Sequence, residues 1–130
     1  MNAIPVMLAM SSGKQEGTNI WASEKVIGLI HGNDGDLDVI QWGRFKCKLQ
    51  SFCDANLNTF MPDVVKREYG KTFGIHIGQF RIVGFFAEGY RSFIAIDWFV
   101  KKVQRNDRRM NAIYEKTDSI RESKAWTKIE

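Results

Sequence analysis

The sequence predicts an α+β domain in which helices pack against one antiparallel sheet of about four strands. Three strand-like runs with tight connections lie between residues 71 and 100, and apolar residues recur at helical spacing before and after them. The chain has 130 residues, of which 44% are hydrophobic, enough for one ordinary core but short for two domains. We therefore expect a single domain over residues 25–130, with an N-terminal helical region and a C-terminal helix packed on the sheet.

Residues 1–24 are expected to form an extended or flexible arm outside this domain. Residues 11–19 (SSGKQEGTN) are small and polar, as in loops. The apolar run Ala3–Met10 has no preceding Lys or Arg and is far shorter than the roughly 20 residues of a membrane span. We therefore expect a cytoplasmic protein with no membrane partner.

The segment Lys25–His31 (KVIGLIH) is rich in branched residues and ends at turn-forming residues, which predicts the first strand. From Asp36 the apolar spacing changes to three and four residues, which predicts an amphipathic helix. Its apolar residues are Leu37, Ile40, Trp42, Phe45, Leu49, Phe52 and Cys53.

Three aspartates, Asp34, Asp36 and Asp38, precede this helix. A calcium loop would also need a central glycine and a terminal glutamate, so we interpret the aspartates as helix N-terminal carboxylates. Pro62 interrupts the chain beyond the helix, and Met61–Tyr69 is expected to form a short helix or turn.

The second half of the chain predicts a three-stranded antiparallel meander followed by a helix. The strands are expected at Lys71–Ile77, Phe80–Ala87 and Arg91–Val100, because only two or three residues connect each pair. Asn106 and Asp107 can cap the final helix. Its residues expected to face the sheet are Met110, Ile113, Tyr114, Thr117 and Ile120.

The charge is unevenly distributed along the chain. Residues 1–65 hold five Lys or Arg against seven Asp or Glu, a net charge of −2, and residues 66–130 hold fourteen against eight, a net charge of +6. A basic field attracts polyanions such as RNA or DNA, although an ordinary solvated surface gives the same statistic.

Cys47 and Cys53 have no second Cys or His pair at metal spacing, so neither a disulfide framework nor a zinc site is indicated. We expect no metal and no cofactor.

The segment GQFRIVGFF (78–86) followed by FIAIDWFVKKVQRNDRRMNAIYEK (93–116) resembles the core of RelE/HigB-type toxins of bacterial toxin–antitoxin pairs. In that family a hairpin strand opens with an aromatic–Arg pair, matched here by Phe80-Arg81. An apolar strand then runs into a Phe-x-Lys-Lys segment, matched by Phe99–Lys102, and a terminal helix follows. The resemblance covers about residues 71–122.

The resemblance implies a ribosome-dependent endonuclease that cleaves mRNA and is neutralised by a cognate antitoxin. The implied partners are therefore the antitoxin, the ribosome and mRNA, with operator DNA bound only through the antitoxin. Cleavage through the RNA 2′-hydroxyl needs a base, an acid and cations around the phosphate, all of which Arg, Lys, His and Tyr can supply without a metal.

Four residues are candidates for this chemistry. Arg81 matches the family arginine and suits bidentate phosphate binding, although it can instead pair with Glu88 or Asp97 across the sheet. His76 can act as a general base, or make a structural hydrogen bond. Lys102 completes the cationic set. Tyr114 can donate a proton or stack on a base, but its spacing also fits a core residue.

The expected RNA-binding residues are Lys101, Arg105, Arg108 and Arg109. Lys101 and Arg105 follow the most apolar strand, so they emerge at the sheet edge, where an ordinary solvated strand exit is the other interpretation. Arg108 and Arg109 open the final helix, where positive charge opposes the helix dipole and a bound anion would offset that cost.

Two other functions remain open from the sequence. One is a non-enzymatic inhibitor on the same scaffold, as in the ParE branch associated with DNA gyrase. The other is a phage- or plasmid-borne relative that only binds nucleic acid or protein. Gly74 and Gly84 depart from the family pattern, which keeps this last alternative open.

Overall fold

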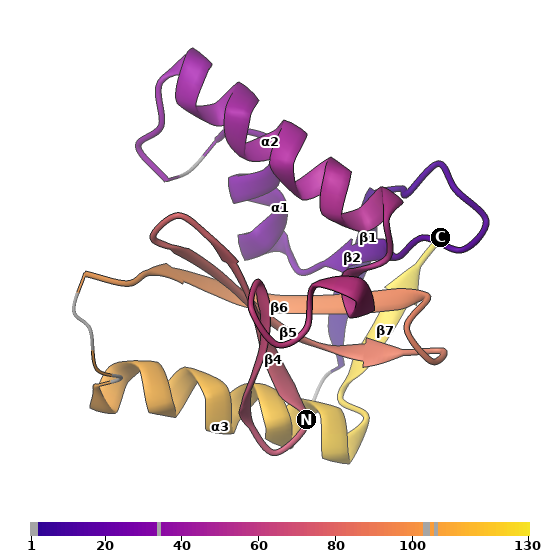
Figure 1. The fold of residues 1–130 in the computed structure, drawn as a ribbon. Coiled ribbons are helices and arrows are strands. Elements are labelled where there is room, and N and C mark those ends of the chain that lie inside the picture. The colour runs from indigo at the N-terminus through magenta and orange to yellow at the C-terminus, as the bar shows by residue number, and fades with distance from the viewer. Residues whose placement is uncertain (1–2, 34, 103–104, 106) are drawn as a thin grey trace.

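A computed structural model describes residues 3–33, 35–102, 105 and 107–130, and shows an α+β fold built on one seven-stranded mixed sheet (Figure 1). The strands, in their spatial order, are β3 (Val65–Tyr69), β4 (Thr72–Ile77), β5 (Phe80–Ala87), β6 (Ser92–Val100), β2 (Asn19–Ala22), β1 (Ile4–Met10) and β7 (Trp126–Ile129). Neighbouring strands are antiparallel except for the pairs β6–β2 and β1–β7, which are parallel.

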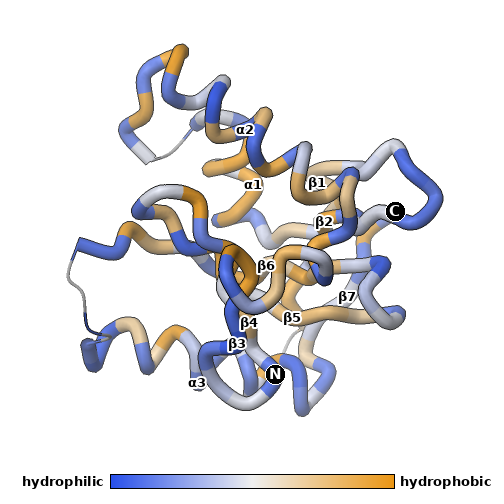
Figure 2. Tube along the Cα trace, in the orientation of Figure 1, coloured by the Kyte–Doolittle hydropathy of each residue, from blue (hydrophilic) through white to orange (hydrophobic). Residues whose placement is uncertain are grey.

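Helices cover both faces of the sheet. α1 (Glu24–Ile30), α2 (Val39–Asp54) and the 3₁₀ turn η1 (Leu57–Phe60) pack on one face, and α3 (Arg108–Ser123) lies along the other (Figure 1). Hydrophobic residues are concentrated in the central strands and alternate with hydrophilic residues along α2 and α3 (Figure 2). The sheet is therefore the middle of three layers, with a separate apolar core on each side.

The predicted meander and both long helices are confirmed. β4, β5 and β6 pair in the expected order, joined by short turns at Gly78-Gln79 and near Glu88-Gly89. Asp38 caps α2 through a capping box with Gln41, and Asp107 caps α3 by accepting from the Met110 N–H at 2.9 Å. Asp34 and Asn106, also considered at these helix starts, lie outside the described residues.

The predicted first strand at Lys25–His31 is wrong, because this segment lies in α1. The Ser23 side chain caps the helix by accepting from the Val26 N–H, and Val26, Leu29 and Ile30 are fully buried at helical spacing. A short apolar run with branched residues fits both the helical period and the strand period. The N-cap residue Ser23 favours the helix.

The expected arm and the expected four-stranded sheet also need correction. Residues 4–10 and 19–22 form β1 and β2 within the sheet, where Val6, Ile20 and Ala22 are fully buried. In the segment Met61–Tyr69, expected as a helix or turn, residues 61–64 do form a turn, but Val65–Tyr69 forms β3. The C-terminal β7 brings the sheet to seven strands.

Asp118 anchors α3 to the edge of the meander. Its carboxylate accepts from the Lys71 N–H and the Arg121 Nε–H, both at 3.1 Å, and from the Thr72 hydroxyl at 3.5 Å. Burial raises the pKa of Asp118, but these bonds and the Arg121 charge outweigh burial and hold the pKa below its ordinary value. Gly70 is required beside it, because a Cβ there would lie 2.5 Å from the carboxylate.

Replacing Asp118 is therefore expected to destabilise the protein. Asp118→Ala removes the acceptor of the part-buried Lys71 N–H bond and of the Arg121 Nε–H, and should lower the free energy of unfolding by about 2 kcal/mol at neutral pH. Because the native pKa of Asp118 is depressed, its contribution is present above the ordinary carboxyl pKa and disappears as the pH falls through the native value. Urea denaturation from pH 7 to pH 3 measures both effects.

The control is Glu115→Ala on the exposed side of the same helix, which should change the stability by less than about 0.5 kcal/mol. Equal stability of the Asp118 and Glu115 variants at pH 7 would contradict the anchoring role.

Candidate functional site

Four polar side chains gather on the face of the β3–β5 sheet that α3 covers. We call Glu68, His76, Arg81 and Tyr114 the hairpin cluster. His76 and Arg81 are directly opposite each other on β4 and β5, and both point to the α3 side because their neighbours Ile75, Ile77, Phe80 and Ile82 pack toward α1 and α2. Glu68 and Arg81 also act electrostatically on Tyr114 of α3.

The His76 ring is fixed by a carboxylate. Its Nε2 lies 2.9 Å from Glu68 Oε1, and the side chains are 20% and 13% exposed. Burial raises the pKa of Glu68, but the His76 bond and charge, with Lys66 and Lys101 nearby, lower it by more. When Nε2–H donates to the carboxylate, Nδ1 is the ring nitrogen that can accept a proton.

Arg81 is held at the hairpin turn by its own backbone. Nη1–H donates to the Gly78 carbonyl at 2.8 Å and to the Phe80 carbonyl at 3.0 Å. Nε is buried and has no hydrogen-bond partner among the described residues. A buried unsatisfied donor costs free energy, so the guanidinium is oriented but incompletely neutralised.

The two carboxylates that the sequence offered as partners of Arg81, Glu88 and Asp97, pair with other residues. Asp97 forms an ion pair with Lys25, and Glu88 forms one with Lys128 and accepts from the Ser92 hydroxyl at 3.1 Å. Neither carboxylate bonds Arg81, so the structure leaves this arginine available for another anion.

Tyr114 occupies the position of a core residue. It is 2% exposed, packs edge to face on Phe99, and lies in one apolar cluster with Val83 and Met110. Burial and the Glu68 charge raise its pKa, while Arg81 opposes them. Tyr114 therefore packs as a core residue next to the hairpin cluster.

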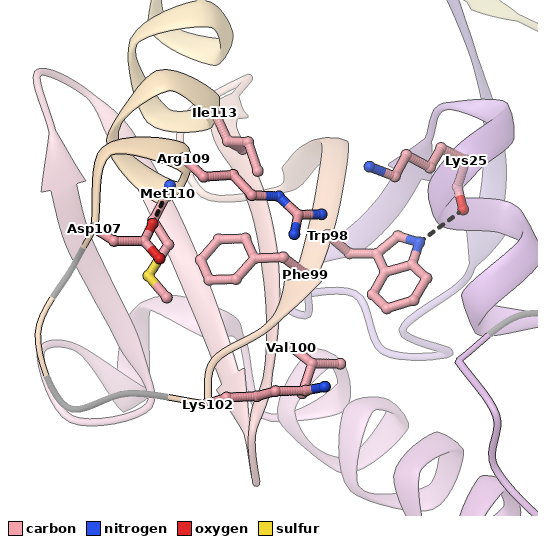
Figure 3. A pocket seen from close by; sticks show the side chains of 9 residues that line it. All are labelled: Lys25, Trp98, Phe99, Val100, Lys102, Asp107, Arg109, Met110 and Ile113. Carbon is pink, nitrogen blue, oxygen red and sulfur yellow. Dashed lines mark hydrogen bonds between the residues drawn. The ribbon is translucent and has the colours of Figure 1, made fainter.

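A groove of about 470 Å³ lies beside the hairpin cluster, between the end of β6 and the start of α3 (Figure 3). We call it the β6 groove. Its apolar walls come from Trp98, Phe99, Val100, Met110 and Ile113, and its cations from Lys25, Lys102 and Arg109. Phe99, which lines the groove, is paired with Arg81 across the strands, so the groove adjoins the strand that carries Arg81.

The predicted basic residues thus divide between two places. Lys102 and Arg109 line the β6 groove, and Lys101 lies close enough to Glu68 to lower the carboxyl pKa. Arg105 and Arg108 are exposed, and both follow β6 in the sequence. Sequence reasoning missed Glu68 and Lys25, because their segments were assigned the wrong secondary structure.

The described residues contain no group of three or more His, Cys, Asp or Glu side chains that could hold a metal ion. Cys47 is exposed and Cys53 is buried, and both are free thiols. Burial, with a smaller effect of the Asp54 charge, raises the pKa of Cys53 to about 12, so this thiol stays protonated at neutral pH.

No helix in the described part of the chain combines the length and apolar character that a membrane crossing requires. Comparisons with protein-family models, with curated proteins and with solved structures each give no match to this chain.

The Glu68–His76 contact predicts a pH-dependent contribution to stability. The native pKa of Glu68 is below the ordinary value of 4.5, so its ionised form stabilises the fold above that value and loses this effect as the pH falls. Glu68→Gln should therefore be less stable than wild type at pH 6, and the difference should shrink toward pH 3. Urea denaturation of both proteins measures it.

Glu115→Gln, an exposed carboxylate on α3, is the matched control and should show little difference at either pH. A Glu68→Gln difference that stays constant or grows as the pH falls would refute the assignment.

Proposed function

We propose that this protein is the toxin of a toxin–antitoxin pair, an endoribonuclease that cleaves mRNA on the ribosome through the RNA's own 2′-hydroxyl. The order of elements supports the proposal: the β4–β6 meander is followed by α3, with Phe80-Arg81 opening β5 and Lys101-Lys102 leaving β6. These are the segments in which the sequence resembles RelE/HigB toxins. A cytoplasmic location and inhibition by a cognate antitoxin belong to the same proposal.

One observation carries it. His76, oriented by Glu68, lies directly opposite Arg81, whose Nε is buried without a hydrogen-bond partner among the described residues. In the register of this hairpin the two residues form a non-hydrogen-bonded pair, whose Cα atoms are about 4.5 Å apart, so their side chains are close. A nitrogen base beside an incompletely neutralised guanidinium is the arrangement that 2′-hydroxyl attack on a phosphate needs.

Three residues then have separate roles in the cleavage reaction. His76 Nδ1 takes the proton of the 2′-hydroxyl as the 2′-oxygen bonds to phosphorus. Arg81 stabilises the charge on the pentavalent phosphate, for which its planar donors are suited. Lys102 gives a proton to the departing 5′-oxygen. The products are a 2′,3′-cyclic phosphate and a 5′-hydroxyl, with no water consumed and no electron transferred.

Exposed cations around this site would hold the RNA backbone. Arg105, Arg108 and Arg109 are exposed, and Lys101 is half-buried beside the cluster. Arg108 and Arg109 lie at the positive end of the α3 dipole, where phosphate groups offset the repulsion of like charges. Their removal should weaken RNA binding with a strong dependence on salt.

The proposal predicts growth arrest with mRNA cleavage on induced expression. Wild type should arrest cells and leave mRNA fragments with cyclic phosphate at the cut on translating ribosomes. Arg81→Ala and His76→Gln should each lower the cleavage rate by about 100-fold or more, because each removes a group that acts in the transition state. Mapping of mRNA 5′ ends and single-turnover cleavage on programmed ribosomes measure these effects.

Lys48→Ala on the exposed side of α2 removes one positive charge away from the site and is the matched control, expected to cleave as wild type does. Arrest with intact mRNA would favour a gyrase-type inhibitor instead. Unimpeded growth with soluble wild-type protein would favour a relative that only binds.

A further inference from the structure

β6 is paired along its whole length on one side and along less than half of it on the other. β5 pairs with residues from Ser92 to Val100, whereas β2 pairs only with Ser92–Ala95. Ser23 ends the second ladder: its N–H donates to the Ala95 carbonyl at 2.9 Å and its hydroxyl to the Ile96 carbonyl at 2.7 Å. Beyond Ile96 this edge of β6 has no strand beside it among the described residues.

The register shows which backbone groups face this open edge. The Lys101 N–H donates to the Gln79 carbonyl at 2.7 Å, so Lys101 directs its backbone groups toward β5. Because this direction alternates along a strand, Val100 and Trp98, which are paired with Phe80 and Ile82, make no backbone hydrogen bonds to β5. Their N–H and C=O groups therefore point the other way. The Trp98 N–H is accepted by Asp97 Oδ1 at 2.7 Å. Within the described chain, no residue hydrogen bonds to the Trp98 carbonyl or to the Val100 backbone on this side.

The β6 groove lies along this same open edge. Figure 3 shows the Arg109 and Lys25 side chains pointing toward one another past Phe99 and Trp98, with Lys102 beyond Val100. The one carboxylate in the lining, Asp107, already accepts from the Met110 N–H. Lys25 pairs with Asp97, which leaves Arg109 and Lys102 as exposed positive charge beside apolar walls and unpaired backbone.

We propose that the open edge of β6 binds an extended, acidic peptide segment of a partner protein as an additional strand. Its backbone would pair with the Trp98 carbonyl and with the Val100 N–H and C=O, as in β-strand addition. Alternate side chains would pack against Phe99 and Ile113 on one face and Trp98 on the other, and acidic side chains would neutralise Lys102 and Arg109. About five residues span this edge.

A nucleic acid fits the charge but not the rest of the groove. Phosphates and bases do not satisfy a row of strand donors and acceptors at peptide spacing, and the walls are mostly apolar side chains. The proposal does not depend on RNA cleavage, since peptide binding is measured without RNA.

The test uses the full chain and an acetylated, amidated heptapeptide of alternating glutamate and valine. Titration followed by amide ¹H–¹⁵N NMR should shift the signals of Trp98, Val100, Lys102 and Arg109 in a saturable way. A heptapeptide of alternating lysine and valine should not bind. A glutamate–valine peptide N-methylated on its pairing edge should bind at least about tenfold more weakly, because it keeps the side chains and loses the donors.

Two variants at one position separate backbone pairing from side-chain packing. Val100→Pro removes an N–H that faces the open edge and no hydrogen bond of the β5 ladder, so the fold is expected to be retained at this last residue of the strand. Its affinity for the glutamate–valine peptide should fall at least about tenfold relative to Val100→Ala, which keeps the N–H.

Several outcomes would overturn the proposal. These are equal binding by Val100→Pro and Val100→Ala, binding unaffected by N-methylation, and no saturable shift up to the solubility limit of the peptide. A further one is an oligouridylate that shifts the same amides while the peptide does not, which would make the groove a nucleic-acid surface. The fold of each variant is checked first by its NMR spectrum.

Discussion

The short parallel ladder between β2 and β6 is the constraint on which the rest of the molecule depends. Among the described strands, β3–β6 and the pair β1 and β7 are joined into one sheet through the pairing of Asn19–Ala22 with Ser92–Ala95. Ile20, Trp21 and Ala22 of β2 and their partners Phe93, Ile94 and Ala95 of β6 are buried, so three of the four residue pairs are protected from water. Parallel strands need a long connection, and the chain between β2 and β6 runs through α1, α2 and η1 on one face before it forms β3, β4 and β5. The opposite face is then left for α3.

The meander and the two long helices could be predicted because their signals are local. The meander strands are separated by two-residue or similarly short turns, and α2 and α3 have both an apolar period and a capping aspartate. The N-terminal strands could not, because β2 is only four residues long and its partner β6 lies about seventy residues away in the sequence. Neither turn residues nor an alternating pattern mark such a short strand in the sequence. Its hydrophobic residues can be assigned to a face of the sheet only when its pairing with β6 is known.

The candidate site was predictable to the same extent. His76 and Arg81 share a face because a two-residue turn fixes the register of their hairpin, so their proximity follows from the sequence alone. Glu68 was missed because β3 was interpreted as helix or turn, and its contact with His76 depends on β3 pairing with β4. The helical period could place Tyr114 against the sheet, but periodicity does not distinguish a core tyrosine from one that lines a site.

The two proposed sites share residues, which links their occupants. Lys102 and Arg109 line the β6 groove and are also assigned to RNA, and Phe99, which lines the groove, is paired with Arg81 across the strands. An acidic strand on β6 would neutralise those cations without changing the hairpin cluster itself. Because such coupling is reciprocal, RNA would lower the affinity of the peptide by the same factor by which the peptide lowers the affinity of RNA. An inhibitor of this kind need not touch His76 or displace α3, whose C-terminal half stays anchored through Asp118.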